Sequence, residues 1–298
     1  MAAIASTSFG TIANEHLAGV IEKIRLGSTV AALSGQEPMK FGTGEIVTFT
    51  SPPKAEFVAE GGDKSPTPAT MATVKTAPHK AQVTVRLNDE VKWADEDYQL
   101  EALSTIQDAI ANALSRALDL GLYYRLNPLT GTATAWTNYL NSTTNRVEVA
   151  ANKLDTYVDD AVGLIVDGGL YSVDGIAITP GAARELGALR DLDGRKLYPE
   201  IGYGVGLTSF GGLAASVSNT VSAQPETAGN DVKAIVGDFR NGIRWGIQRE
   251  IPMQMIEYGD PDGIGDLKRA NQVAIRAEVQ YAWYVDPTRF AVVENATP

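Results

Sequence analysis

The sequence predicts an α+β fold, because helix-like and strand-like segments follow one another without a regular βαβ repeat. Three segments carry this prediction. Apolar residues recur at spacings of three and four over residues 97–126, which is typical of a long helix. Apolar and polar residues alternate over residues 81–88 and again over residues 273–285, as in strands that bury one face.

The N-terminal segment has mainly small side chains, both apolar and polar, and its apolar residues show only weak periodicity. We therefore interpret residues 1–35 as an N-terminal arm rather than a core element. One short amphipathic helix is expected within the arm, ending near Gly27.

A strand is predicted over residues 45–50, which are rich in β-branched and aromatic side chains. Roughly 30 residues, with several prolines and the pair Gly61-Gly62, separate it from the strand at residues 81–88. A connection of this length without its own core is uncommon inside a compact domain. The two strands are therefore expected to form a long hairpin that projects from the body and needs a neighbour to cover it.

The long helix is the strongest prediction along the chain. Asp95 and Asp97 supply a cap or a favourable charge in its first turn, and Asn127-Pro128 ends it. Roughly 30 residues at 1.5 Å per residue make a rod about 45 Å long. A second helix is predicted over residues 147–166, with Gly168-Gly169 at its end.

The remaining predicted elements are shorter. Pro180-Gly181 marks the start of a helix that runs through residues 182–189. We also expect a mobile glycine-rich loop at residues 202–212 and strands at residues 176–179, 234–236, 243–245 and 290–293.

The composition excludes several kinds of chemistry. The 298 residues include no Cys, so the chain has no disulfide, no thiolate nucleophile and no cysteine metal site. The two histidines, His16 and His79, leave little material for a histidine-rich metal centre. The net charge of −11 argues against wrapping nucleic acid, which needs clustered Lys and Arg. The N-terminus has no secretory signal pattern, and the apolar runs are far shorter than the ~20 residues of a membrane span, so a soluble cytoplasmic protein is expected.

Two segments resemble ligand-binding loops only superficially. The glycine-rich residues 202–206 lack the preceding strand and the following helix of a dinucleotide-binding loop, which favours a flexible loop. The segment from Asp260 to Asp266 is acidic, but Asn271 stands where an EF-hand requires Glu. A solvated turn is therefore favoured there.

Other polar residues are also interpreted without a catalytic role. Ser51 and Lys54 have the spacing of a Ser–Lys nucleophile, but the two prolines between them preclude the helical turn which that chemistry needs. His79 has no partner implied by the sequence and is expected to be an exposed loop histidine. Asp159 and Asp160 are expected on the solvated face of the second helix. We predict no catalytic residue, no cofactor and no metal site.

Taken in order, these parts resemble the major capsid proteins of tailed bacteriophages with the HK97-type fold. The resemblance covers nearly the whole chain, and the order and spacing of its motifs are more specific than any one motif. The segments that carry it are residues 55–61, the strand at residues 83–87, the long helix with the turn at residues 127–131, Val236-Gly237-Asp238-Phe239, and Ile275-Arg276-Ala277-Glu278.

The resemblance implies the parts of a shell subunit. Residues 1–35 correspond to the N-terminal arm and residues 36–90 to the extended loop. Residues 91–170 correspond to the peripheral domain with its spine helix, residues 171–248 to the axial domain, and residues 249–298 to the return strands of the peripheral domain.

The implied function is self-assembly into the icosahedral head shell that encloses double-stranded DNA. In this family the extended loop lies across the adjacent subunit, and we expect charges on it to contact that subunit: Lys54, Glu60, Asp63 and Lys64. The implied partners are copies of the chain in hexamers and pentamers, separate scaffold, portal and decoration proteins, and packaged DNA held nonspecifically. No membrane contact is expected. The implied location is the virion, assembled in the host bacterial cytoplasm.

Two alternatives stay open from the sequence. One is an encapsulin, a cellular compartment shell with the same fold that encloses a cargo enzyme. The other is an enzyme that uses the loop from Asp260 to Asp266 with a divalent metal.

The type member of the family joins an extended-loop lysine to an asparagine of the neighbouring subunit, with a glutamate as the base. Laying the last long strand on the family's strand by its proline places Ala277 where the glutamate is expected and Ala270 where the asparagine is expected. Glu278 lies one residue away and is expected on the opposite face of the strand. We therefore predict that this chain forms no such cross-link.

Overall fold

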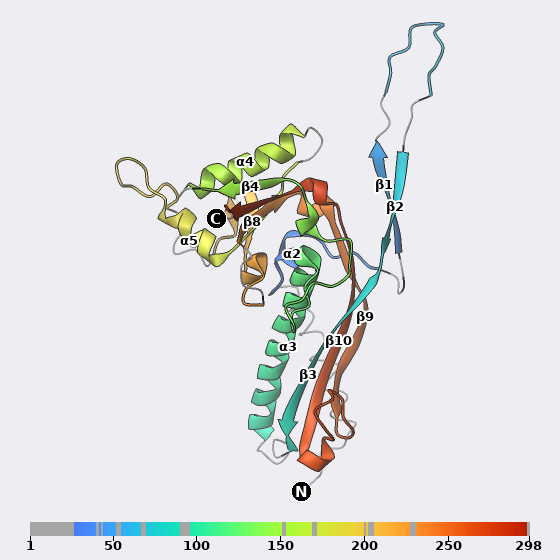
Figure 1. The fold of residues 1–298 in the computed structure, drawn as a ribbon, viewed down its shortest axis with the longest axis vertical. Helices are drawn as coiled ribbons and strands as arrows, with labels where there is room; N and C mark the ends of the chain where they lie inside the picture. Colours follow the sequence, from blue (N-terminus) through green and yellow to red (C-terminus); the bar gives the residue numbers. More distant parts are fainter. Residues whose placement is uncertain are drawn as a thin grey trace.

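The computed structural model describes residues 27–39, 42, 44–51, 55–66, 70–89, 96–150, 153–168, 172–199, 201, 206–226 and 231–296. The helix predicted in the N-terminal arm before Gly27 lies outside these residues. The described strands form a three-stranded sheet, a six-stranded sheet and a separate two-stranded hairpin (Figure 1). The mixture of helices and strands confirms the predicted α+β class.

The three-stranded sheet is antiparallel, with the order β3 (Pro78–Asn88), β10 (Gln272–Val285) and β9 (Ile243–Ile256). Helix α3 (Glu96–Tyr124) lies along one face of this sheet (Figure 1). Alternate residues of β10 face α3 and are buried in a common core: Ile275, Ala277, Val279, Tyr281, Trp283 and Val285. The predicted long helix and the predicted alternating strands are confirmed.

Helix α3 ends in a left-handed turn. Arg125 has a φ of 52°, and the N–H of Leu126 donates to the carbonyl of Leu120 at 3.2 Å. The N–H of Arg125 itself donates to the carbonyl of Gly121 at 2.9 Å, which is the αL pattern of a helix C-terminus. The N–H of Gly131 then donates to the carbonyl of Asn127 at 2.8 Å, which closes the turn predicted to end the helix.

The six-stranded sheet is mixed. Its spatial order is β4 (Arg146–Val149), β11 (Phe290–Asn295), β8 (Val232–Gly237), β5 (Gly175–Ile178), β7 (Leu213–Val217) and β6 (Ser209–Phe210). Helices α4 (Leu154–Asp167) and α5 (Pro180–Ala188) bury their apolar residues against one face. The other face joins the core that contains α3, through Ile235 and Phe290 among others. The sheet includes β4 and β11, so its body extends beyond the predicted axial residues 171–248.

Short helices complete the described elements. They are α2 (Thr29–Leu33), α6 (Phe239–Gly242), η2 (Leu140–Ser142), η3 (Asn219–Ser222), η4 (Lys268–Ala270) and η5 (Pro287–Arg289). Among the described residues, no helix combines the length and the apolar character that a bilayer crossing requires.

The predicted position at which the second helix begins, residue 147, is wrong. Arg146–Val149 form β4, which pairs in parallel with β11, and α4 begins only at Leu154. Val147 and Val149 alternate with polar neighbours, and this segment completes the edge of the sheet. The helical spacing of Val149 with Leu154 and Val158 is therefore coincidental. The predicted C-terminal end is confirmed, because Gly168 caps α4.

The predicted loop at residues 202–212 lies partly outside the described residues. Its last part is a β-hairpin rather than an irregular loop, because β6 pairs antiparallel with β7. Gly211 and Gly212 have φ values of 57° and 85°, which is the backbone conformation that a tight two-residue hairpin turn requires.

The end of the predicted N-terminal arm is part of the core. Val30 of α2 is fully buried, and the buried carboxylate of Asp119 on α3 holds this segment. Asp119 accepts hydrogen bonds from the hydroxyls of Ser28 at 2.5 Å and Thr29 at 2.9 Å and from the N–H groups of Thr29 at 3.0 Å and Val30 at 3.2 Å. Thr220 of η3 donates a fifth bond at 2.7 Å. The interpretation of residues 28–34 as an arm outside the core is therefore wrong.

Candidate functional site

The hairpin of β1 (Gly44–Ser51) and β2 (Thr70–Thr76) projects from the body (Figure 1). The two strands pair antiparallel, from Gly44 opposite Thr76 to Ser51 opposite Thr70. The projecting hairpin was predicted, but its pairing was not, because the strand at residues 81–88 belongs to β3 and pairs with β10 instead. The predicted connection of roughly 30 residues therefore contains its own returning strand, β2.

The tip of the hairpin, residues 55–66, is held by hydrogen bonds within the tip itself. The N–H of Ser65 donates to the Glu56 carboxylate at 2.7 Å across the tip, and the N–H of Gly62 donates to the carbonyl of Ala59 at 2.9 Å. All residues of the tip are exposed, and the ring of Phe57 is fully accessible. Phe57 and its exposed neighbour Val58 thus give the tip an apolar point that nothing within the described part of the chain covers.

Three of the four predicted contact residues lie on this tip, and Lys54 lies outside the described residues. Glu60, Asp63 and Lys64 are exposed. Among the ion pairs between described residues, none includes these three side chains, so their charges are available to another molecule.

The root of the hairpin is closed by Thr76, which joins β1 to β2, and is tied to the body by Gln248. The hydroxyl of Thr76 accepts from the N–H of Gly44 and donates to its carbonyl, each at 3.1 Å. The Gln248 amide of β9 donates to the carbonyl of Gly42 at 2.7 Å. The chain before β1 also passes so close to β9 that a Cβ at Gly246 would meet the carbonyl oxygen of Glu37. The hairpin therefore leaves the body from an anchored base.

His79, at the start of β3, is a further anchor of this root. Its ring packs against two indoles, with centroids 4.0 Å from Trp136 and 4.2 Å from Trp283, and the two indoles also meet each other edge-on at 5.4 Å. Burial lowers the pKa of His79 to about 4, so the ring is neutral at pH 7. The expectation of an exposed loop histidine is wrong, because the tryptophans that cover the ring come from segments remote in the sequence.

The acidic segment from Asp260 to Asp266 closes around an arginine. Nε of Arg86 on β3 donates to Asp262 at 2.7 Å, and its guanidinium also bonds Asp260 and the carbonyl of Gly265. The hydrogen bond from Arg86 lowers the pKa of Asp262 to about 2. The acidic residues of the loop are exposed, as predicted for a solvated turn, and no set of side chains among the described residues is suited to a metal ion. The metal-dependent alternative is therefore not favoured.

The structure brings none of the other candidate motifs into a catalytic arrangement within the described residues. Asp159 and Asp160 are exposed on α4, as predicted. Ser51 ends β1, and Lys54 lies outside the described residues, as do residues 202–205 of the glycine-rich segment. Sequence reasoning missed Asp119, although a lone carboxylate between Leu118 and Leu120 on an apolar helix was a visible signal.

Comparison with solved structures gives the relatives of this chain. A chain from Mycobacterium phage Ogopogo shares 44% sequence identity, covers 90% of this chain and 92% of its own, and superposes with a TM-score of 0.81. A chain from Gordonia phage Cozz shares 28% identity over 91% of this chain and 87% of its own, with a TM-score of 0.78.

A chain from the capsid of an empty GTA particle has the same fold, with a TM-score of 0.60 at 16% identity, over 91% of this chain and 90% of that chain. No protein-family model and no curated protein matches the chain. The relatives of this chain are therefore known from solved structures, and each match covers almost the full length of both chains.

Proposed function

The chain belongs to the major capsid proteins of tailed bacteriophages, and we propose that the projecting β1–β2 hairpin is the element by which neighbouring copies join in the head shell. The protein is a structural component of the virion, and it self-assembles into the shell that encloses the double-stranded DNA. Relatives from phages favour this shell over an encapsulin compartment. The hairpin tip carries the proposal, because its exposed side chains have nothing to cover them within one copy.

The apolar part of the tip supplies the affinity. Phe57 is fully exposed and its neighbour Val58 is also exposed, although the tip around them is ordered by its own hydrogen bonds. A preorganised tip loses little conformational entropy when it binds, so its apolar area is available for association. Fully burying an aromatic side chain of this kind stabilises a contact by about 2–3 kcal/mol.

The charged part of the tip supplies the register. Glu60, Asp63 and Lys64 carry both signs of charge on a short exposed segment. Opposite charges on the neighbouring copy fix how the hairpin lies, whereas exposed pairs add little affinity. We infer that Lys54 extends this charged set.

The two sheet bodies correspond to the two domains that the resemblance implies. We infer that the three-stranded sheet with α3 belongs to the peripheral domain and that the six-stranded sheet with α5 belongs to the axial domain. Helix α4 packs on the six-stranded sheet, although it lies within residues 91–170, which the resemblance assigns to the peripheral domain. Copies then meet in hexamers and pentamers, since homomeric contacts close into symmetric rings. Scaffold, portal and decoration proteins are the expected further partners, and the net charge of −11 favours loose, nonspecific contact with packaged DNA. Assembly takes place in the host cytoplasm.

The experiment replaces residues 55–66 with a short Gly-Ser turn and, separately, makes Phe57→Ser and Phe57→Tyr. Expression with any scaffold, followed by electron microscopy, should show closed shells for the unaltered chain and for Phe57→Tyr. The tip replacement should abolish stable shells, and Phe57→Ser should reduce their yield at least about tenfold, which corresponds to about 1.4 kcal/mol per contact.

Circular dichroism shows whether each variant is folded. A folded tip-replacement variant that still assembles at the yield of the unaltered chain would contradict the role of the hairpin. Shells from Phe57→Ser in normal yield would contradict the role of the aromatic ring alone.

A further inference from the structure

The two sheets are joined by two stretches of chain that run side by side. Strand β8 continues through α6 into β9, while β10 continues through η5 into β11. Because β9 pairs with β10 and β8 pairs with β11, the same two-stranded ribbon passes from one sheet to the other. The ladder stops at Val285 opposite Ile243 and resumes at Phe290 opposite Gly237. Between these pairs each strand makes one helical turn.

The two turns are built alike and are bonded to each other. Each begins with an aspartate that caps its own turn: Asp238 accepts from the N–H of Asn241 at 3.1 Å, and Asp286 accepts from the N–H of Thr288 at 3.2 Å. The main chains bond across the gap, from the N–H of Asp286 to Gly242 at 2.9 Å and from the N–H of Asp238 to Arg289 at 3.2 Å. The bend therefore occurs at the same level in both strands.

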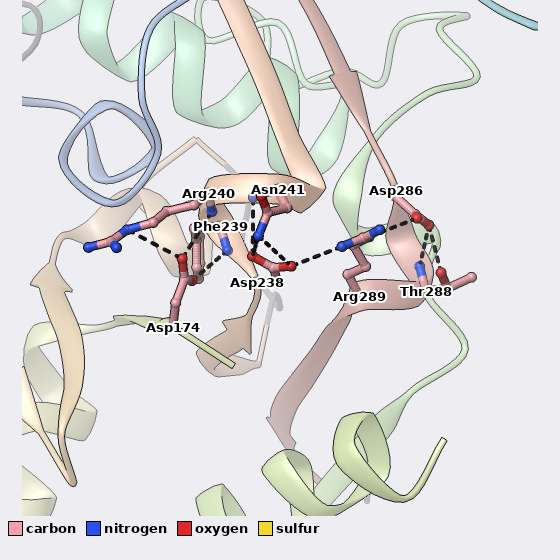
Figure 2. A network of polar contacts seen from close by, with 8 residues as sticks. All are labelled: Asp174, Asp238, Phe239, Arg240, Asn241, Asp286, Thr288 and Arg289. Carbon is pink, nitrogen blue, oxygen red and sulfur yellow. Dashed lines mark hydrogen bonds and ion pairs between the residues drawn. The ribbon is translucent and has the colours of Figure 1, made fainter. Parts of the chain in front are cut away.

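Arg289 links the two capping aspartates, as Figure 2 shows. Its Nη1 donates to the Asp238 carboxylate at 2.9 Å and its Nε lies 3.2 Å from the Asp286 carboxylate. Burial alone would lower the pKa of Arg289, but the bonds to Asp238 and Asp286 outweigh it and raise the pKa. Only 2% of the Asp238 side chain is exposed, so this bond is largely shielded from water. A planar guanidinium holds two carboxylates in a fixed geometry, which a point charge does not.

The inner side of the bend is filled by one aromatic ring. A Cβ at Gly242 would lie 2.7 Å from the ring of Phe290, and a Cβ at Gly237 would lie 2.6 Å from the carbonyl oxygen of Arg289. Phe239 of the other turn meets Phe290 edge-on, with ring centroids 5.2 Å apart. Glycines at these two positions thus allow the ring to act as a wedge between the turns.

A third aspartate braces the bend from the six-stranded sheet. Asp174, just before β5, accepts from the N–H of Phe239 at 2.7 Å and from the N–H of Arg240 at 3.2 Å (Figure 2). These are the first N–H groups of α6, which have no partner within a helix. The turn between β8 and β9 is therefore held from both sides.

We propose that these paired turns form an elbow that sets the angle between the two sheets, and that Arg289 keeps that angle fixed. Apolar packing at the junction is strong but not directional, whereas the hydrogen bonds of Arg289 to two carboxylates are directional. Loss of Arg289 should leave the core folded and let the sheets rotate about it. With the proposed function as premise, the consequence is that the curvature of the shell is set inside each subunit.

The absence of cysteine from the chain allows a direct measurement of the angle. Spin labels on Thr156→Cys of α4 and Asn88→Cys of β3, both exposed positions, report the distance across the elbow by double electron–electron resonance. Labelled chains are diluted with unlabelled chains so that each distance belongs to one subunit. The test variants are Arg289→Gln, which removes the charge, and Arg289→Lys, which keeps the charge without the planar fork.

The control is Arg146→Gln. Arg146 bonds Glu294 at 2.6 Å and Asn141, and it links β4 to β11 within one sheet. It is a similarly exposed arginine in a similar bridge that does not cross the elbow. This variant therefore reports the effect of losing an arginine–carboxylate bridge that lies away from the junction of the two sheets.

The distance distribution should be narrow for the unaltered chain and for Arg146→Gln. It should be at least about twofold broader for Arg289→Gln and Arg289→Lys. A width for Arg289→Gln equal to that of the unaltered chain would overturn the elbow. Broadening in Arg146→Gln as well would also overturn it, because the effect would then not be specific to the junction.

The shell supplies the second readout. The diameters of Arg289→Gln particles in electron micrographs should spread beyond those of unaltered particles, whereas Arg146→Gln particles should keep one diameter. If Arg289→Gln broadened the spin-label distance distribution but its particles kept one diameter, the link between the elbow and shell curvature would be overturned. Failure of the unaltered chain to form shells would count against the proposed function and leave the distance result standing.

Discussion

Lowering the pH should weaken the root of the hairpin through His79. The pKa of this histidine falls from 6.5 to about 4 in the folded protein, because its ring is partly buried against Trp136 and Trp283. Above pH 6.5 the ring is neutral in both the folded and the unfolded chain, so it does not change the free energy of unfolding. As the pH falls from 6.5 to 4, the unfolded chain takes up a proton and the folded chain does not, so stability decreases over that window.

The magnitude follows from the size of the shift. A decrease from 6.5 to about 4 corresponds to at most about 3.5 kcal/mol at about 1.4 kcal/mol per unit of pKa. The ring is only partly buried, so screening by solvent reduces this figure to about 1–2 kcal/mol. Many carboxylates titrate in the same window, and a control that isolates His79 is therefore needed.

The control is His79→Phe, which keeps an aromatic ring against the two indoles and carries no titrating group. Urea unfolding of unassembled protein at pH 7.5 and pH 4.5, followed by tryptophan fluorescence, gives the free energy of unfolding for both chains. The unaltered chain should lose about 1–2 kcal/mol more than His79→Phe between these pH values. If both chains lost the same free energy of unfolding between these pH values, the assignment of a lowered pKa to His79 would be refuted.

Three further predictions concern the core, the chain before the hairpin and the assembled shell. Asp119→Ala should destabilise the protein by about 3–5 kcal/mol in urea unfolding, because it removes the shared acceptor of five buried hydrogen bonds. Gly246→Ala should cost about 1–3 kcal/mol, because the added Cβ meets the carbonyl of Glu37 and the chain must shift. Shells heated in denaturant should run on a gel as single chains near 31.7 kDa, since Ala277 packs in the core and Glu278 points away from it toward Lys80, at 2.6 Å.

The two substitutions, Asp119→Ala and Gly246→Ala, each have a matched control. Asp160→Ala removes an exposed carboxylate from α4 and should change stability by less than about 0.5 kcal/mol. Gly181→Ala, in α5 with open space around it, should stabilise by about 0.5 kcal/mol rather than destabilise. An Asp119→Ala effect no larger than that of Asp160→Ala would contradict the buried network. A ladder of covalent oligomers joined by Lys–Asn isopeptides would contradict the alignment that predicts no cross-link.

Local patterns in the sequence were sufficient for the long elements. Helix α3 and strands β3 and β10 lie where the spacing of apolar residues placed them, because each buries one continuous face and the spacing of that face is set by the backbone itself. The turn after α3 was predictable for a similar reason, since proline and glycine restrict or extend the backbone locally. The projecting hairpin was also predictable, from a long segment with prolines and no core of its own.

Contacts between remote segments decided the rest. Strand β1 pairs with β2 rather than β3, and Arg146–Val149 form a strand because β11 offers an edge. Residues 28–30 are buried where Asp119 accepts their hydrogen bonds. A sequence pattern shows that a face is to be buried, but it does not show which element covers it. Hydrogen-bond partners across a sheet and around a buried charge depend on where the chain brings distant residues together. For this reason His79 and the Arg289 elbow became visible only in the tertiary structure, whereas the capsid fold was already indicated by the order of its parts.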